Sequence, residues 1–174
     1  MKSDLLDVKD MKPIPFLIRL EEPEDVSIID TLHEEAFGPG RFARTAFRLR
    51  EGIAHDPRLS FVGMVGGDVA GSVRLTPIAI GAADALLLGP LAVSPRYKNK
   101  GIGRALVKAA LLAAKDLGEA YALLVGDAPY YAPLGFKQVE FGSIAFPGPV
   151  DPARVLVAPL AGGPIPQGRA RPRS

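Results

Sequence analysis

The stretch Leu88–Lys108, LGPLAVSPRYKNKGIGRALVK, decides the fold. It begins inside a strongly apolar run, Ala85–Val93, which has the length and composition of a central strand. An amphipathic helix over Gly101–Leu117 follows, with alanine and leucine on its buried face, and Tyr121–Val125 is a second apolar strand. Strand, helix and strand in this order predict a parallel pair joined by a right-handed crossover.

The glycine-rich turn before this helix has the character of an anion-binding site. Glycine lets the backbone approach a bulky anion, and the N–H groups of a first helical turn favour phosphate. The turn consists of Lys98, Asn99, Lys100, Gly101, Ile102 and Gly103, and Arg104 follows it. A short glycine motif alone is a weak signal, and an ordinary turn before a helix explains it equally well.

A proline interrupts the apolar strand. Pro90 has no N–H to donate to a sheet ladder, so we expect the ladder to break there. Beyond it the N–H groups of Leu91 and Val93 point to the same edge, where an extended ligand with its own amides could dock as an added strand. A plain edge strand that contains a proline is the alternative, and this feature alone does not separate the two.

A ligand with two phosphates and an extended, amide-bearing arm describes coenzyme A. The segment resembles motif A of the GNAT superfamily of N-acetyltransferases, Q/R-x-x-G-x-G/A. The resemblance covers Leu91, Ala92 and Val93, then Lys98–Gly103 and the helix after them. A second family signature, an aromatic–Tyr pair four residues before Gly-Phe, resembles Tyr130–Phe136, YYAPLGF. The family prefers Gln or Arg at the position of Lys98. Because the pyrophosphate would be bound mostly by backbone N–H groups, we expect this difference to change the geometry of phosphate binding rather than to abolish it.

The resemblance implies an α/β fold with a central mixed β-sheet. Six to seven strands would be flanked by about four helices, with a splayed parallel strand pair. The resemblance extends from Phe16 to about Ala158. We therefore expect a flexible arm at 1–15 and one acyltransferase domain at 16–160. Because proline, glycine and arginine dominate residues 161–174, we expect a disordered tail there.

The remaining pattern predicts the elements around this unit. Apolar residues at helical spacing favour helices over 24–37 and 41–50, and the second carries a basic stripe, Arg41, Arg44 and Arg48. That stripe is either solvated surface, which we favour, or a contact for an acidic acceptor, the ribose phosphate of the coenzyme or an acidic carrier protein. A hairpin is expected over 59–65 and 69–80, and further strands over 16–20, 136–140 and 154–158.

The resemblance also implies roles for individual residues. Backbone N–H groups of Leu91 and Val93 would hold the pantetheine and thioester end, and those across Asn99–Arg104 would hold the pyrophosphate. Tyr131 matches the family's general-acid tyrosine, since a phenol with a pKa of about 10 is protonated at neutral pH and can donate to the leaving thiolate. Tyr130 lies about 100° around the same short helix and is expected to bind the coenzyme. Without the motif, both tyrosines would be interpreted as core or rim aromatics.

The general base is less defined by the sequence, because the strand Ala85–Val93 contains no acid. The candidates are Asp127, just past the strand Tyr121–Val125, and Glu34 on the first helix. Asp127 is more simply a helix cap ahead of Pro129, and a charged residue such as Glu34 is usually just solvated. A water chain, or an acceptor that arrives as the neutral amine, would also serve.

Composition limits the function classes. The chain has 174 residues, of which 48% are hydrophobic and 23% charged, with a formal net charge of +2, as in an ordinary soluble domain. It has no cysteine and two well-separated histidines, so a cysteine nucleophile is excluded and no metal site is apparent. Its apolar runs are much shorter than the ~20 residues that a membrane-spanning helix needs. The sequence also lacks the basic face with interleaved aromatic residues that is typical of nucleic-acid binding. We expect a cytoplasmic protein, monomeric or homodimeric.

These observations predict an acyl-coenzyme A-dependent N-acyltransferase that moves acetyl from acetyl-CoA to the primary amine of a small molecule. One alternative is transfer to a protein amine, because acceptor specificity lies in variable loops. Another is a domain that senses acyl-CoA without turnover. A domain that binds ATP or NAD is disfavoured, because the turn lacks the Gly-Lys-Ser/Thr of a P-loop and Leu106 stands where the Rossmann motif needs a third glycine.

Overall fold

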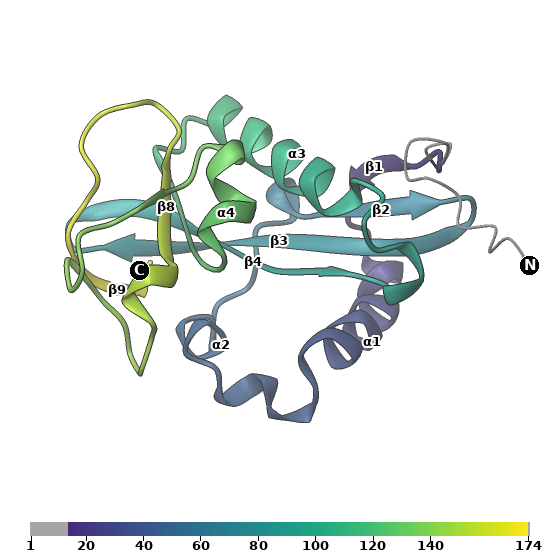
Figure 1. Ribbon diagram of the computed structural model, residues 1–174, viewed down its shortest axis with the longest axis horizontal. Coiled ribbons are helices and arrows are strands. Elements are labelled where there is room, and N and C mark those ends of the chain that lie inside the picture. The colour runs from purple at the N-terminus through teal and green to yellow at the C-terminus, as the bar shows by residue number, and fades with distance from the viewer. Residues whose placement is uncertain (1–13, 174) are drawn as a thin grey trace, which may run out of the picture.

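The computed structural model describes residues 14–173 and shows a mixed sheet with helices on both faces (Figure 1). Seven strands follow the order β1-β2-β3-β4-β5-β8-β6, while β9 pairs with β3 and β7. The strands are β1 Leu17–Leu20, β2 Phe61–Val65, β3 Asp68–Ile80, β4 Ala83–Val93, β5 Tyr121–Val125, β6 Lys137–Gln138, β7 Ile144–Ala145, β8 Val155–Pro159 and β9 Gly168–Pro172. The helices are α1 Val26–Phe37, α2 Thr45–Leu49, α3 Ile102–Asp116 and α4 Ala128–Tyr131. This architecture confirms the predicted fold class.

The parallel pair, β4 and β5, separates early. The two strands pair only over Leu86–Leu87 against Ala122–Leu123, although β4 remains paired with β3 as far as Val93. The register between β3 and β4 shifts around Pro90, as expected of a residue that cannot donate to the ladder. The sheet therefore opens between the carboxyl ends of its two central strands.

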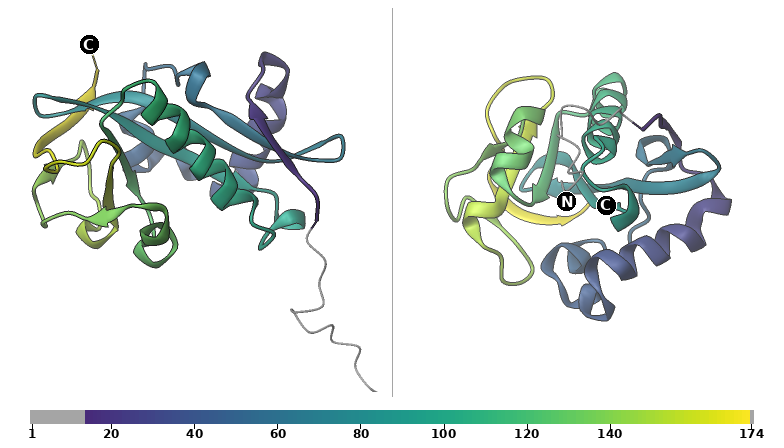
Figure 2. Two further views of the ribbon diagram at one scale, coloured as in Figure 1. Left: turned by 90° about the horizontal axis from the view of Figure 1, so that it is seen from above. Right: turned by 45° about the vertical axis from the view of Figure 1, so that its right-hand side comes forward.

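Apolar side chains of β4 alternate between two cores. Leu86 and Leu88 pack with Leu106 of α3, whereas Leu87 packs with Leu49 of α2 on the other face. Figures 1 and 2 show α3 across one face of the sheet and the α1–α2 segment across the other. A long helix is thus fixed with its start beside the opening between β4 and β5.

The predicted second helix is interrupted. Residues Pro39–Ala43 form a 3₁₀ turn, and α2 begins only at Thr45 because Arg44 adopts an extended conformation. The expected continuous basic stripe is therefore wrong: Arg41 donates to the Gly38 carbonyl, and Arg44 lies on the far side of the break. No helix among the described residues is long and apolar enough to cross a membrane.

The C-terminal segment is folded, so the expected disorder is wrong for residues 168–172. Strand β9 pairs antiparallel with the end of β3 and parallel with β7. Beyond it, the Arg173 guanidinium donates to the backbone carbonyls of Ile78 and Ala85 and pairs with Glu119 at 3.2 Å. These bonds offset the poor core-forming composition of this end. Residues 1–13, most of the predicted arm, lie outside the described residues.

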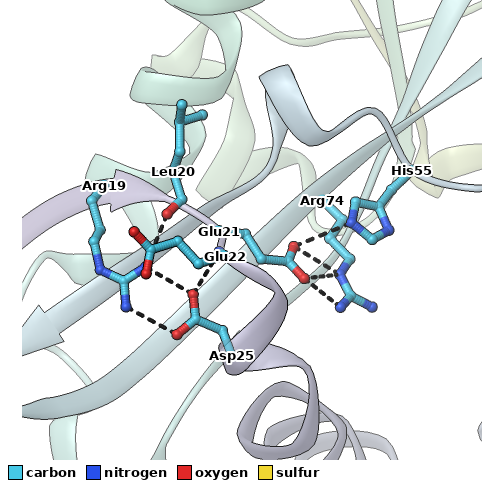
Figure 3. Close-up of polar contacts among 7 residues, drawn as sticks. All are labelled: Arg19, Leu20, Glu21, Glu22, Asp25, His55 and Arg74. Atoms are coloured by element: carbon cyan, nitrogen blue, oxygen red, sulfur yellow. Dashed lines mark hydrogen bonds and ion pairs between the residues drawn. The ribbon is translucent and has the colours of Figure 1, made fainter.

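A buried polar cluster fixes the connection between β1 and α1 to the sheet (Figure 3). The guanidinium of Arg74 on β3 donates three hydrogen bonds of 2.6 to 3.2 Å to the Glu21 carboxylate, and His55 Nε2 lies 3.4 Å from the same carboxylate. Arg19 holds Asp25 by two hydrogen bonds of 2.8 and 2.9 Å, which keep the pKa of Asp25 below its usual value. The Glu21 carboxylate is therefore engaged within the fold.

Candidate active site

A cleft of about 920 Å³ opens where β4 and β5 separate. One wall is the end of β4, the opposite wall is the end of β5 with α4, and the segment from α1 to α2 borders a third side with the loop over residues 149–151. Lining residues include Phe37, Arg44, Thr45, Phe47, Arg50, Gly89, Leu91, Val93, Gly126, Asp127, Tyr130, Tyr131 and Asp151. The cleft lies at the carboxyl ends of parallel strands, the usual place for ligands in α/β folds.

A second cavity of about 510 Å³ surrounds the glycine-rich turn. Both cavities are lined by Val93, Lys98, Gly103 and Tyr130, so they form one continuous groove. The groove brings together most of the residues predicted to bind a coenzyme. Ala92 and Lys100 are the exceptions, since Ala92 is buried in the sheet and neither residue lines either of these two cavities.

The start of α3 presents backbone donors to the smaller cavity. Asn99 and Gly101 have left-handed backbones, with φ of 63° and 85°, and Gly101 is the N-cap without a side chain to accept from the helix. The N–H groups of Ile102–Arg104 precede the first helical hydrogen bonds, and the helix dipole favours an anion beside them. A Cβ at Gly103 would lie 2.6 Å from the hydroxyl of Tyr130, so the close approach of α3 to α4 requires glycine there.

Ladder bonding directs two N–H groups of β4 toward the opening. The N–H of Ser94 donates to the carbonyl of Ala70 on β3 at 2.7 Å. Because alternate residues of a strand bond to the same side, the N–H groups of Leu91 and Val93 face the opposite side, where β5 no longer pairs. The geometry expected for strand addition is therefore present.

The two tyrosines of α4 lie nearly perpendicular to each other. Their ring centroids are 4.8 Å apart with the planes at 80°. Tyr130 faces the turn, where the Arg104 guanidinium lies 5.5 Å from its ring centroid, and Tyr131 packs edge-on against Phe136. Burial, with smaller contributions from Tyr130 and Asp127, raises the pKa of Tyr131 to about 12. Tyr131 is therefore a neutral hydrogen-bond donor in the cleft.

A sequence profile of the acetyltransferase (GNAT) family matches residues 26–136, which include the turn, both strands of the opening and the two tyrosines. The chain belongs to the GNAT family of N-acetyltransferases. It is 33% identical over 127 residues to the uncharacterized N-acetyltransferase YhbS of Escherichia coli strain K12, covering 70% of this chain and 73% of YhbS. The uncharacterized N-acetyltransferase YjhQ of the same strain is 28% identical over 138 residues, which cover 77% of this chain and 76% of YjhQ.

Solved structures of GNAT proteins match the fold over almost the whole chain. The crystal structure of E. coli YhbS in complex with CoA has a TM-score of 0.75 and 27% identity, covering 94% of this chain and 92% of YhbS. A GNAT acetyltransferase of Brucella melitensis in complex with acetyl-CoA has a TM-score of 0.67 and 26% identity, covering 92% of this chain and 97% of that protein. The resemblance seen in the two sequence signatures is thus confirmed.

The carboxylates of this GNAT acetyltransferase do not converge on one point of the cleft. Asp127 occupies the N-cap position of α4, but its carboxylate makes no cap hydrogen bond, is largely exposed and lies 3.6 Å from Arg154. Glu34 is exposed on α1 and does not line the cleft, so its position gives no support to the expected role as base. Asp151 lines the cleft, but its carboxylate accepts from the Ala153 N–H. Among residues 14–173 no group of three or more His, Cys, Asp or Glu could hold a metal ion.

Two residues of the acetyltransferase cleft were not singled out from the sequence. Gly126 lies directly against Tyr131, and its position at the end of a predicted strand was a usable signal for close packing. Arg50 lines the cleft just past α2, with its guanidinium 5.0 Å from the ring centroid of Phe47. No sequence pattern marks Arg50, because its burial depends on how α2 packs against β4.

Proposed function

We propose that this GNAT enzyme transfers the acetyl group of acetyl-CoA to the primary amine of a small molecule. The observation that carries the proposal is the continuous groove from the start of α3 to the opening between β4 and β5. The donors at its two ends suit a pyrophosphate and an amide-bearing arm. The E. coli and Brucella melitensis proteins of the same fold were crystallised with CoA and acetyl-CoA.

Each part of the groove has one task in this proposal. The N–H groups of Ile102–Arg104 bind the pyrophosphate, aided by the positive end of α3. The N–H groups of Leu91 and Val93 hold the pantetheine arm and polarise the thioester carbonyl. Bound acetyl-CoA supplies the activated acyl group that the amine attacks.

Tyr131 stabilises the leaving thiolate as a hydrogen-bond donor. Its pKa of about 12 lies well above that of a thiol, about 8.5. Full transfer of the phenolic proton to the sulfur is therefore uphill by about 5 kcal/mol, whereas a hydrogen bond to the developing charge is available throughout. Asp127 is exposed to water, so we propose that the proton of the amine leaves through solvent at that side of the cleft.

The border of the cleft supports a small acceptor. The Thr45 hydroxyl of α2 donates to the carbonyl of Pro149 and joins the two segments that border the cleft on the side away from α3. A small amine fits within the cleft volume. We propose that the reaction takes place in the cytoplasm, with which the absence of cysteine is compatible.

Calorimetric titration with acetyl-CoA tests the proposal, using the wild type and a Gly103→Glu variant. We expect saturable binding near one site per chain, and its loss when a carboxylate enters the phosphate cradle. Release of free thiol with a panel of small amines and peptides then identifies the acceptor class. Failure of the wild type to bind acetyl-CoA at high micromolar concentration, or turnover of peptides alone, would contradict the proposal.

A further inference from the structure

Arg50 carries a buried cationic group in the wall of the cleft. Its Nε and Nη1 atoms are buried and have no hydrogen-bond partner among the described residues. Its Nη2 atom lies 2.7 Å from the place that a Cβ of residue 89 would occupy, so the guanidinium lies close to the β4 backbone at Gly89. Arg50 as a residue is partly exposed and lines the cleft, so its side chain borders the space that a ligand would occupy.

Three acids, Glu21, Asp127 and Asp151, do not pair with Arg50. Glu21, one of two buried acids in the polar cluster described above, is bound by Arg74 and lies beside His55, as Figure 3 shows. Asp127 pairs with Arg154, and Asp151 is exposed. None of the ion pairs between residues 14–173 includes Arg50.

The surroundings of Arg50 favour an anion further. Desolvation lowers the pKa of Arg50 to about 10, and the nearby charge of Arg74 acts in the same direction. His33 on α1 is buried with an unpartnered Nε2, and desolvation lowers its pKa to about 4, so it is neutral at pH 7 and adds no second positive charge beside Arg50. An uncompensated buried cation is costly, whereas an anion that enters the cleft removes most of that cost.

We propose that Arg50 binds a carboxylate of the substrate, so that the acyl acceptor is a small amine that carries a carboxylate. This inference rests on the proposed acetyl-CoA-dependent reaction. Gly89, beside the guanidinium, lies two residues before Leu91, and both residues line the cleft. A small amino acid bound there would have its amine at the thioester and its carboxylate at the guanidinium. A planar guanidinium can bind such a carboxylate through two parallel hydrogen bonds.

The same chemistry could come from the acyl donor, since a dicarboxylic acyl group such as succinyl also brings a carboxylate to this place. Acyl-transfer assays can separate the two sources. The first arm compares standard amino acids with their amides, using acetyl-CoA. The second arm compares succinyl-CoA with acetyl-CoA, using an amine without a carboxylate. Each arm is run on the wild type, Arg50→Met, Arg50→Lys and Arg48→Met.

Arg48→Met is the matched control, because Arg48 is an exposed arginine two residues earlier that does not line the cleft. In the wild type and Arg48→Met we expect a carboxylate preference in the first arm, whereas a preference confined to the second arm would assign the carboxylate to the acyl donor and overturn the acceptor proposal. In Arg50→Met that preference should fall by about 30-fold or more, because one partner of a buried ion pair is missing. Arg50→Lys should keep part of the preference, and Arg48→Met should keep all of it.

Calorimetry of each variant with acetyl-CoA separates the two levels of inference. If the wild type does not bind acetyl-CoA, the proposed reaction itself fails. If all variants bind acetyl-CoA but Arg50→Met keeps the wild-type preference, or the wild type has no carboxylate preference in either arm, the role of Arg50 is overturned. Loss of a buried unpaired cation should leave Arg50→Met at least as thermally stable as the wild type, so its fold is expected to survive.

Discussion

Gly126 supports the position of Tyr131, and its replacement by alanine gives a sharp test of the site. A Cβ at this position would lie 2.6 Å from Cε2 and 3.1 Å from Cδ2 of Tyr131, and 3.0 Å from Cδ1 of Leu124. The backbone of Gly126 is not left-handed, so alanine can adopt its conformation without backbone strain. The effect of Gly126→Ala is therefore confined to the displacement of its neighbours.

The size of that displacement sets the expected loss of rate. Ordinary van der Waals contact begins near 3.4 Å, so the ring edge must retreat by roughly 0.8 Å. Misplacement of a reacting group by about 1 Å lowers the rate by about 100-fold. Overpacking at a well-packed position costs about 1–3 kcal/mol of stability. We expect kcat to fall by roughly 30- to 100-fold while the protein remains folded.

The assay is the steady-state rate of thiol release with an accepted amine, measured for Gly126→Ala, Tyr131→Phe and the double variant. If Gly126→Ala acts only by moving the Tyr131 hydroxyl, it should cause little further loss of rate in a variant that already lacks this hydroxyl. The double variant should then lie within about threefold of Tyr131→Phe. Gly67→Ala is the control, because a Cβ at this turn position meets no atom within 4 Å.

Two outcomes would refute this reasoning. Multiplicative losses in the double variant would mean that Gly126 acts on catalysis through something other than the Tyr131 hydroxyl. An unchanged kcat in Gly126→Ala and in Tyr131→Phe would mean that Tyr131 has no role in catalysis. A fall in thermal stability large enough to unfold Gly126→Ala would be visible by circular dichroism before the kinetics are interpreted.

Three further predictions address other parts of the structure. Gly103→Ala should weaken acetyl-CoA binding roughly tenfold in calorimetry, because its Cβ would displace the Tyr130 hydroxyl from 2.6 Å. Arg173→Ala should lower the free energy of unfolding in urea by about 1–3 kcal/mol, because it removes bonds to two backbone carbonyls and to Glu119. The pKa of His33 is lowered from 6.5 to about 4, so the unfolded chain binds the extra proton between these values. Stability should therefore fall as the pH drops from about 6.5 to 4, by at most about 3 kcal/mol, and His33→Leu should flatten this part of the profile.

Each of these has a matched comparison. Gly67→Ala should leave the affinity for acetyl-CoA unchanged. If Gly67→Ala and Gly103→Ala weakened binding equally, the proposed role of Gly103 in the phosphate-binding turn would be contradicted. The exposed Arg169→Ala should change stability by less than about 0.5 kcal/mol, and an equal loss there would contradict a specific role for Arg173. An acid profile that is the same for the wild type and His33→Leu would mean that His33 is not buried in its neutral form.

The centre of the fold was predictable from sequence because local signals agree there. An apolar strand, a glycine-rich turn, an amphipathic helix and a second apolar strand each have their own physical cause, and together they allow one arrangement. The proline in the first strand predicted a break in the ladder, and the register shifts at that point. The cleft forms there because β4 remains on β3 while β5 departs.

The C-terminal strand was missed because composition measures only how well a segment can form its own core. Residues 168–172 contribute little apolar surface, but they complete an existing sheet edge, and Arg173 satisfies carbonyls of β3 and β4. The break at Arg44 was missed for a related reason. Apolar spacing across residues 41–50 fits a helix, whereas the extended backbone of Arg44 is a tertiary outcome.

The opening between β4 and β5 and the buried charge of Arg50 share one structural origin. Gly89 has a left-handed φ of 131°, so this point of β4 requires glycine for its conformation alone. The same missing side chain leaves the space in which the guanidinium of Arg50 approaches the strand. Two residues later the N–H of Leu91 faces the opening. A carboxylate at Arg50 and a thioester carbonyl at Leu91 would therefore be positioned by a single rigid strand, so a small acceptor can be oriented without closure of a lid.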